Sequence, residues 1–195
     1  MSSSLKDTQA FFAVRAVGWE ARFPDDEPRY KQAINEMLSR AVVRVLDVGC
    51  GTGRAIPFLR QKAKHVVALD VTAEMLAEVR RLGRGEAARL VQADGSRLPF
   101  GDASFEAIFA AGFVPHLQDP RAGLAELARV TAPGGCLAIF HPIGRAALAA
   151  RHGGAPSDDD ITSPARLPGL LDDAGWRLES LDDSADRYLA LATRT

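Results

Sequence analysis

Short apolar runs alternate with amphipathic stretches along most of the chain. Runs of the length of one buried strand occupy residues 42–48, 65–70, 88–92, 105–111, 136–140, 176–181 and 188–193. Apolar positions at helical spacing fill residues 55–63, 73–82, 121–130 and 164–174 between them. Strands that alternate with amphipathic helices are typical of an α/β fold built on a parallel sheet. The pattern therefore predicts an α/β protein in which helices pack on such a sheet.

An N-terminal segment precedes the first predicted strand. Residues 7–17 and 30–40 have helical patterns. Residues 18–28 between them contain two prolines and three consecutive acids, which favour an irregular loop. A chain of 195 residues is close to the size of one domain, for which about 150 residues is a usual length. We therefore expect a single domain, with a helical extension over residues 1–40 and an α/β core over residues 41–195.

The first strand runs directly into a turn with glycine at alternate positions, Gly49, Gly51 and Gly53. Glycine permits positive φ and lets a ligand lie against the backbone. The spacing differs from the G-x-G-x-x-G dinucleotide fingerprint, and the turn lacks the Lys-Ser/Thr pair of a Walker loop. Asp47, two residues before the first glycine, would repel a pyrophosphate and suits a ligand with an ammonium group. A turn that binds a nicotinamide nucleotide is the alternative.

Three segments together resemble one known family. The string DVGCGTG at residues 47–53 resembles the first signature motif of the class I S-adenosylmethionine-dependent methyltransferases. Residues 93–100 resemble later signatures of the same family, and residues 127–135 are similar to its RVLKPGG run. The resemblance covers about residues 41–141, and the segments occur in the order that the family has. Glu106 stands where the family usually has Asp.

The resemblance implies a fold and a cofactor. The fold is a Rossmann-like three-layer α/β/α sandwich, whose seven-stranded sheet has the order 3-2-1-4-5-7-6 with strand 7 antiparallel. The cofactor is S-adenosyl-L-methionine, and the product is S-adenosyl-L-homocysteine. Asp70 ends the second predicted strand, where Rossmann-type sheets place an acid on ribose hydroxyls. Asp94 matches the family's acid at the adenine amino group. The implied cofactor-binding residues are Asp47, Gly49, Cys50, Gly51, Gly53, Asp70, Val71, Met75, Asp94, Gly95 and Ala111.

The acceptor side of the site is less patterned, because methyl transfer depends mainly on holding the acceptor close and aligned. We assign no catalytic residue. His116 and His141 fall on predicted loops at the ligand edge, and either could serve as a base because histidine titrates near neutrality. In the family, an N-terminal extension packs over the cofactor cleft and shapes the substrate pocket. The substrate-pocket candidates are Trp19, Arg22, Phe23, His116 and His141. Alternatively, Trp19 and Phe23 only fix the extension to the core.

Composition limits the partners. A formal net charge of −1 gives no overall field that attracts nucleic acid or an anionic membrane. The two cysteines form no CxxC pair, the N-terminus lacks the apolar core of a signal peptide, and no apolar stretch reaches the ~18 residues of a membrane span. We expect a cytoplasmic monomer or homodimer that binds a small-molecule substrate, with no metal, no nucleic acid and no membrane partner.

The predicted function is methyl transfer from S-adenosylmethionine to an O, N or C nucleophile of a small molecule. The chain lacks an N/D-P-P-Y/F run after residues 105–111, which weighs against methylation of adenine N6, cytosine N4 or glutamine. The first alternative is a non-catalytic regulatory or partner subunit that binds S-adenosylmethionine. A nicotinamide-dependent oxidoreductase and an aminopropyl transferase are further alternatives. The turn spacing weighs against the former and the lack of an additional acid cluster against the latter.

Overall fold

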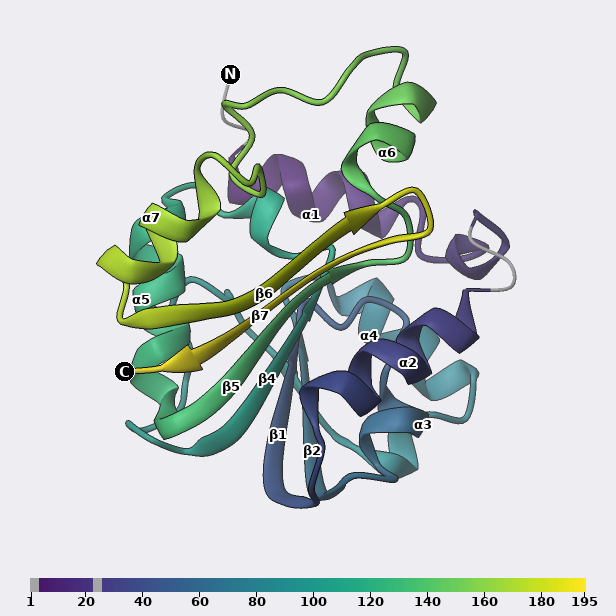
Figure 1. The fold of residues 1–195 in the computed structure, drawn as a ribbon. Helices are drawn as coiled ribbons and strands as arrows, with labels where there is room; N and C mark the ends of the chain where they lie inside the picture. The colour runs from purple at the N-terminus through teal and green to yellow at the C-terminus, as the bar shows by residue number, and fades with distance from the viewer. Residues whose placement is uncertain (1–3, 23–25) are drawn as a thin grey trace.

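The computed structural model describes residues 4–22 and 26–195. A seven-stranded sheet of order β3-β2-β1-β4-β5-β7-β6 forms its centre (Figure 1). The strands are β1 (Val42–Val48), β2 (Ala63–Asp70), β3 (Arg89–Gln92), β4 (Phe105–Ala111), β5 (Thr131–His141), β6 (Trp176–Ser184) and β7 (Arg187–Arg194). The first five strands pair in parallel, whereas β7 is antiparallel to both β5 and β6. The predicted strand order is confirmed.

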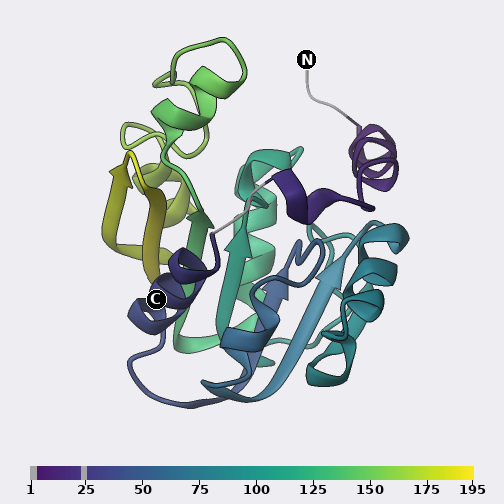
Figure 2. The same cartoon turned by 90° about the vertical axis from the view of Figure 1, so that its right-hand side faces the viewer.

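Helices cover both faces of the sheet (Figures 1 and 2). On one face lie α2 (Glu27–Met37), α3 (Ile56–Leu59) and α4 (Ala73–Arg81), and on the other lie α5 (Pro120–Val130) and α7 (Leu167–Asp173). Three layers result, as a Rossmann-like sandwich requires. The remaining helices are α1 (Leu5–Ala13) and α6 (Arg145–Arg151), with 3₁₀ turns η1 (Trp19–Arg22), η2 (Gly85–Ala87) and η3 (Val114–His116).

Alternation along the strands divides the apolar core between the two faces. In β1, Val45 packs in the cluster under α2 and α3, and Leu46 packs in the cluster under α5 and α7. Both side chains are fully buried. Successive side chains of a strand point to opposite faces, so a strand with helices on both sides is apolar throughout. Asp47 is the only buried polar residue of this strand, and it lies on the α2 face.

The helix predicted over residues 55–63 is wrong in its length. One turn, α3, forms there, and β2 already begins at Ala63. Parallel pairing explains the shortening, because β2 pairs Ala63 with Val42 and so reaches the start of β1. The glycine turn also uses part of the connection. Only a short helix therefore fits between the two strands.

The N-terminal extension differs from its predicted pattern as well. The first helix begins at Leu5 with a capping box between Ser4 and Asp7, and it ends at Ala13 rather than at residue 17. The expected irregular segment contains the turn η1, and α2 already starts at Glu27, with Pro28 in its first turn. Proline is well tolerated at that position because its missing N–H has no partner in the helix.

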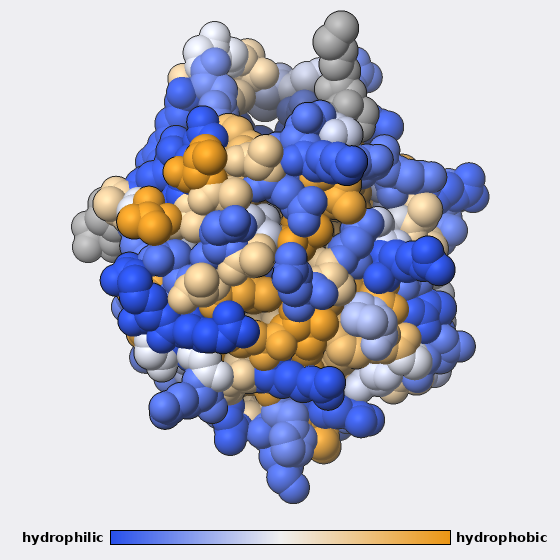
Figure 3. Space-filling view, turned by 180° about the vertical axis from the view of Figure 1, so that it is seen from behind, coloured by the Kyte–Doolittle hydropathy of each residue, from blue (hydrophilic) through white to orange (hydrophobic). Residues whose placement is uncertain are grey.

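The face opposite to the view of Figure 1 is mixed, with hydrophilic side chains around patches of apolar ones (Figure 3). Among the described residues, none of the helices has the length and apolar character needed to cross a membrane.

Candidate functional site

The carboxyl ends of the first strands meet at one edge of the sheet. β1 pairs with β2 so that Val48 lies opposite Leu69, and β2 pairs with β3 so that Asp70 lies opposite Gln92. The glycine turn after β1, Asp70 at the end of β2 and Asp94 just after β3 therefore lie side by side. In open α/β sheets, ligands bind beyond this edge. The structure thus brings the central candidates from the sequence together at one place.

The glycine turn has left-handed backbone at three positions. The φ angles of Gly49, Gly51 and Gly53 are 65°, 54° and 75°. A Cβ added at Gly49 would lie 2.8 Å from the ring of Phe113, and one at Gly53 would lie 2.6 Å from Ile56. A Cβ added at Gly51 would have no described heavy atom within 4 Å. The outer two glycines therefore pack tightly, whereas the middle one faces open space in which a ligand could lie against the backbone.

Asp70 holds the turn to the second strand. Its Oδ2 accepts a hydrogen bond from the Gly51 N–H at 2.8 Å, and its Oδ1 accepts one from the Thr72 N–H at 2.8 Å. Burial raises the pKa of Asp70, and these two hydrogen bonds oppose the rise. A carboxylate oxygen has two lone pairs, so each oxygen can still accept from a ligand hydroxyl. The Thr72 side chain, at the N-terminus of α4, makes no capping hydrogen bond.

Asp47 carries the clearest sign of a missing partner. It is 1% exposed, and its Oδ2 atom has no hydrogen-bond partner among the residues that the structure describes. Burial, with a smaller contribution from Asp70, raises the pKa of Asp47 to about 8. A buried polar atom without a partner costs about 1–3 kcal/mol. An ammonium group of a ligand would supply the missing donor, so the site fits the amino acid end of such a ligand.

Phe113 connects the two ligand-facing loops, and no motif of the sequence pointed to it. Its ring lies against Gly49, and a Cβ added at Gly95 would lie 2.6 Å from the same ring. Beside it, Asp94 Oδ1 accepts hydrogen bonds from the backbone N–H and the hydroxyl of Ser96. The signal that could have found Phe113 is its place two residues after β4, on the ligand edge.

The other cofactor candidates occupy several environments. Cys50 is buried, and burial raises its pKa well above the ordinary thiol value, which does not suit a nucleophile. The carbonyl of Val71 accepts hydrogen bonds from Gln9 of α1 at 2.9 Å and from Gln92 at 3.2 Å. Met75 is buried within α4, and Ala111 ends β4. The contact from Gln9 places α1 directly over the end of the second strand.

The extension contacts His116 through edge-to-face aromatic rings. The Phe12 ring lies 5.3 Å from the Trp19 ring and 5.2 Å from the His116 ring, both edge to face. Arg22 lies 5.4 Å from the centre of the Trp19 ring. Burial lowers the pKa of His116. His116 thus packs against the extension. Phe23, which is also a substrate-pocket candidate, lies outside the described residues.

A small apolar cavity of about 40 Å³ lies beyond β4 and β5. Phe113, His141 and Tyr188 are among its lining side chains, together with Ile143 and Arg145. The Nδ1 atom of His141 lies 2.9 Å from the carbonyl oxygen of Ile143, and burial lowers the pKa of this imidazole. Of the two candidate histidines, only His141 lines this cavity. No motif of the sequence pointed to Tyr188 or Arg145, because their positions depend on the antiparallel hairpin and on the chain after β5.

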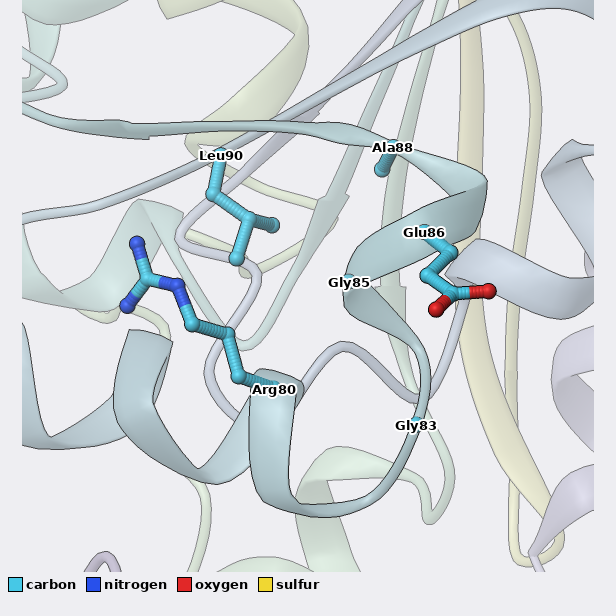
Figure 4. A pocket seen from close by; sticks show the side chains of 6 residues that line it. All are labelled: Arg80, Gly83, Gly85, Glu86, Ala88 and Leu90. Atoms are coloured by element: carbon cyan, nitrogen blue, oxygen red, sulfur yellow. The ribbon is translucent and has the colours of Figure 1, made fainter.

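A larger cavity, of about 490 Å³, lies away from these residues, between the end of α4, η2 and β3. Arg80 and Leu90 line it from two sides, whereas the carboxylate of Glu86 points away from both (Figure 4). None of the candidates from the sequence lines it, and its wide opening makes it a surface hollow. Volume alone is therefore a poor guide to the site, and the perturbed acids mark the strand edge instead.

Within residues 4–22 and 26–195, no group of three or more His, Cys, Asp or Glu side chains is arranged to hold a metal ion.

Comparison with known proteins agrees with this geometry. Residues 46–139 match the protein family described as "Methyltransferase domain". The demethylmenaquinone methyltransferase of Clavibacter sepedonicus is 42% identical over 98 residues, which are 49% of this chain and 40% of that protein. The malonyl-[acyl-carrier protein] O-methyltransferase of Pectobacterium atrosepticum is 34% identical over 126 residues, 64% of this chain and 49% of that protein. The chain spans about half the length of the curated relatives that it matches.

A solved structure matches over more of the chain. The S-adenosylmethionine-dependent methyltransferase from Aquifex aeolicus has a TM-score of 0.70 and 26% identity, covering 85% of this chain and 89% of that one. Fold, strand edge and family match together define the class. Residues 46–139 form a methyltransferase domain, and the chain has the fold of the class I S-adenosylmethionine-dependent methyltransferases, whose cofactor is S-adenosylmethionine.

Proposed function

We propose that this protein transfers a methyl group from S-adenosylmethionine to a small-molecule acceptor. The observation that carries the proposal is the buried Asp47 oxygen beneath the glycine turn, for which the described residues offer no hydrogen-bond partner. The amino acid end of S-adenosylmethionine has the ammonium group that this oxygen lacks. The family match over residues 46–139 supports the same cofactor.

Each part of the edge has a separate role in the proposal. Asp47 and the backbone of the glycine turn hold the amino acid end, with Gly51 offering its open face. Asp70 accepts hydrogen bonds from the ribose hydroxyls, and Asp94 with Gly95 binds the adenine. The bound cofactor supplies a methyl group activated by a sulfonium. The protein contributes mainly by alignment of the acceptor, because proximity and orientation contribute up to about 7–11 kcal/mol.

The cavity beyond β4 and β5 is the proposed acceptor site. Its lining is mainly apolar, with the Phe113 ring and the Ile143 side chain, so it favours an apolar part of a small acceptor. The similar proteins act on different acceptors according to their names, demethylmenaquinone in one case and malonyl-[acyl-carrier protein] in the other. Sequence similarity therefore does not choose the acceptor, and screening should begin with small apolar compounds that carry an O, N or C nucleophile.

We expect Asp70→Asn to weaken binding of S-adenosylhomocysteine by about 10-fold, because an amide nitrogen would face ligand hydroxyls and backbone N–H groups that need an acceptor. Calorimetric titration of the wild type and the variant measures this change. The matched control is Asp102→Asn, at an exposed ion pair with Arg129 away from the edge. Wild-type protein that binds a nicotinamide nucleotide but neither S-adenosylmethionine nor S-adenosylhomocysteine would contradict the proposal.

The second candidate function is a binding subunit without catalysis. It predicts tight binding of S-adenosylmethionine together with no formation of S-adenosylhomocysteine with any acceptor. Mass spectrometry of reactions with a panel of acceptors separates it from the enzyme. Formation of one methylated product excludes it.

His141 gives a pH prediction for the methyl transfer. Burial lowers its pKa, so the imidazole is neutral at pH 7 and can accept a proton from the acceptor. We expect kcat/KM to be constant above pH 7 and to fall at acidic pH, with a midpoint below the ordinary histidine value of 6.5. His141→Gln should remove this acidic limb, whereas His152→Gln, at an exposed histidine, should keep it. An unchanged profile in His141→Gln would show that His141 is not the base.

A further inference from the structure

Two acids of the extension meet two arginines of the core beside the glycine turn. The acids are Glu20 in η1 and Asp26 just before α2, and the arginines are Arg54 at the end of the turn and Arg84 after α4. The side chains of Asp26 and Arg54 are 4% and 9% exposed, and those of Arg84 and Glu20 are 14% and 30% exposed. This four-residue group is called the turn cluster below. Its formal charges balance, and most of it is shielded from water.

Glu20 lies at the centre of the turn cluster. Its two carboxylate oxygens accept a bidentate pair of hydrogen bonds from Arg84, both at 3.1 Å. Arg54 Nη2 lies 3.0 Å from Glu20 Oε2 and also donates to the Glu20 carbonyl oxygen. The other terminal nitrogen of Arg54 donates to Asp26. The Glu20 side chain of the extension thus joins Arg54 and Arg84, two core residues that are far apart in the sequence.

The turn cluster also holds Thr52, which lies between Gly51 and Gly53, two glycines with left-handed backbone. The hydroxyl of Thr52 donates to Glu20, and the carbonyl of Thr52 accepts from Arg84 at 2.9 Å. The Thr52 side chain is therefore held by the extension, and its carbonyl is held by the core arginine that pairs with Glu20. The neighbouring Gly51 N–H donates to Asp70 on the opposite side. The conformation of the turn is thus defined by polar contacts on both sides.

We propose that Glu20 is a positioning residue for the cofactor, which holds the glycine turn in its binding conformation through Thr52, Arg54 and Arg84. Glu20 acts through these three residues rather than by contact with the cofactor. The inference rests on the proposed cofactor site and adds that an acid of the N-terminal extension determines part of its affinity.

Burial makes this role stronger than that of a surface ion pair. Exposed pairs contribute little to stability, whereas removal of one partner of a buried pair leaves an uncompensated charge. Burial alone would raise the pKa of Glu20, but hydrogen bonds from Arg84 and Thr52 and the charge of Arg54 lower it to about 2. Glu20 is therefore ionised throughout the neutral range.

The test compares cofactor affinity with stability in matched variants. Glu20→Gln keeps the shape of the side chain and removes its charge, and we expect the Kd for S-adenosylhomocysteine to rise about tenfold by calorimetry. The control is Glu78→Gln, because Glu78 is also a shielded acid, paired with Arg81 on the surface of α4. The control should keep the wild-type Kd, whatever its change in thermal stability. An unchanged Kd in Glu20→Gln, with or without a fall in Tm, would overturn the inference.

A second pair of variants decides the question if Glu20→Gln does not fold. Thr52→Ser keeps the hydroxyl that donates to Glu20, and Thr52→Val removes it while keeping the size. We expect wild-type affinity in Thr52→Ser and a several-fold higher Kd in Thr52→Val. Equal affinities in the two would overturn the inference. Failure of the proposed function is distinguishable, because the wild-type protein itself would then not bind S-adenosylhomocysteine.

Discussion

Asp47→Asn is expected to weaken binding of S-adenosylhomocysteine by on the order of 100-fold and, at the same time, to stabilise the protein without cofactor. Loss of one partner of a buried ion pair costs about 3–5 kcal/mol, and each 1.4 kcal/mol is about tenfold in affinity. The bound ammonium would lose its carboxylate partner in this variant. Opposite effects on binding and stability are the signature of a residue retained for function at a cost in stability.

The stabilising effect depends on pH with a defined sign. The pKa of Asp47 is raised from 3.8 to about 8 in the folded protein, so the folded state binds more protons than the unfolded chain between these values. Stability therefore falls as pH rises from about 4 to about 8, and above that the full penalty, on the order of 5 kcal/mol, applies. Asparagine does not titrate, so the advantage of the variant in Tm should be small near pH 4 and largest above pH 8.

Thermal unfolding at several pH values and calorimetry in buffers of different ionisation enthalpy check both parts. A bound ammonium favours ionised Asp47, so binding should release a proton near neutral pH, and the wild-type affinity should rise with pH toward 8. The variant should show neither the proton release nor the rise. A Tm difference that is the same at pH 5 and pH 8.5 would contradict the account of Asp47.

The strands were predictable from short runs rich in apolar residues, whereas their order was predictable only from the family resemblance. The first three strands lead into the acids and glycines that the resemblance marked. Because the carboxyl ends of parallel strands share one edge, Asp47, Asp70 and Asp94 had to meet once the strand order was correct. This part of the site was predictable because it depends on topology alone.

The remaining features depend on contacts between distant segments. Glu20 and Arg84 are 64 residues apart, and nothing in the local sequence of either indicates that they meet. The same applies to Phe113, whose ring fits between Gly49 and Gly95 only in the folded chain. The short α3 likewise reflects the register of β2 against β1, since the helical pattern of residues 55–63 alone favours a longer helix. Tertiary context decided these three cases against or beyond local propensity.

Two alanine substitutions in the glycine turn should differ in their main effect, one on stability and the other on cofactor affinity. At Gly49, φ is 65° and an added Cβ would lie 2.8 Å from Phe113, so Gly49→Ala combines backbone strain with a collision. We expect it to lower the free energy of unfolding by about 2–3 kcal/mol. At Gly51, φ is 54° and an added Cβ meets no described atom within 4 Å, so Gly51→Ala should cost only about 1 kcal/mol. Its methyl group would instead enter the space proposed for the cofactor and raise the Kd for S-adenosylhomocysteine more than tenfold.

Urea unfolding and calorimetric titration of both variants separate the two effects. The double variant Gly49→Ala/Phe113→Ala removes the ring that the new Cβ would strike. Gly49→Ala should therefore cost less stability in the Phe113→Ala background than in the wild type. Additive losses in this cycle would show that strain at Gly49, rather than the collision, dominates. If Gly51→Ala binds S-adenosylhomocysteine as tightly as the wild type, the cofactor does not lie against the middle of the turn, and its amino acid end must approach Asp47 from another side.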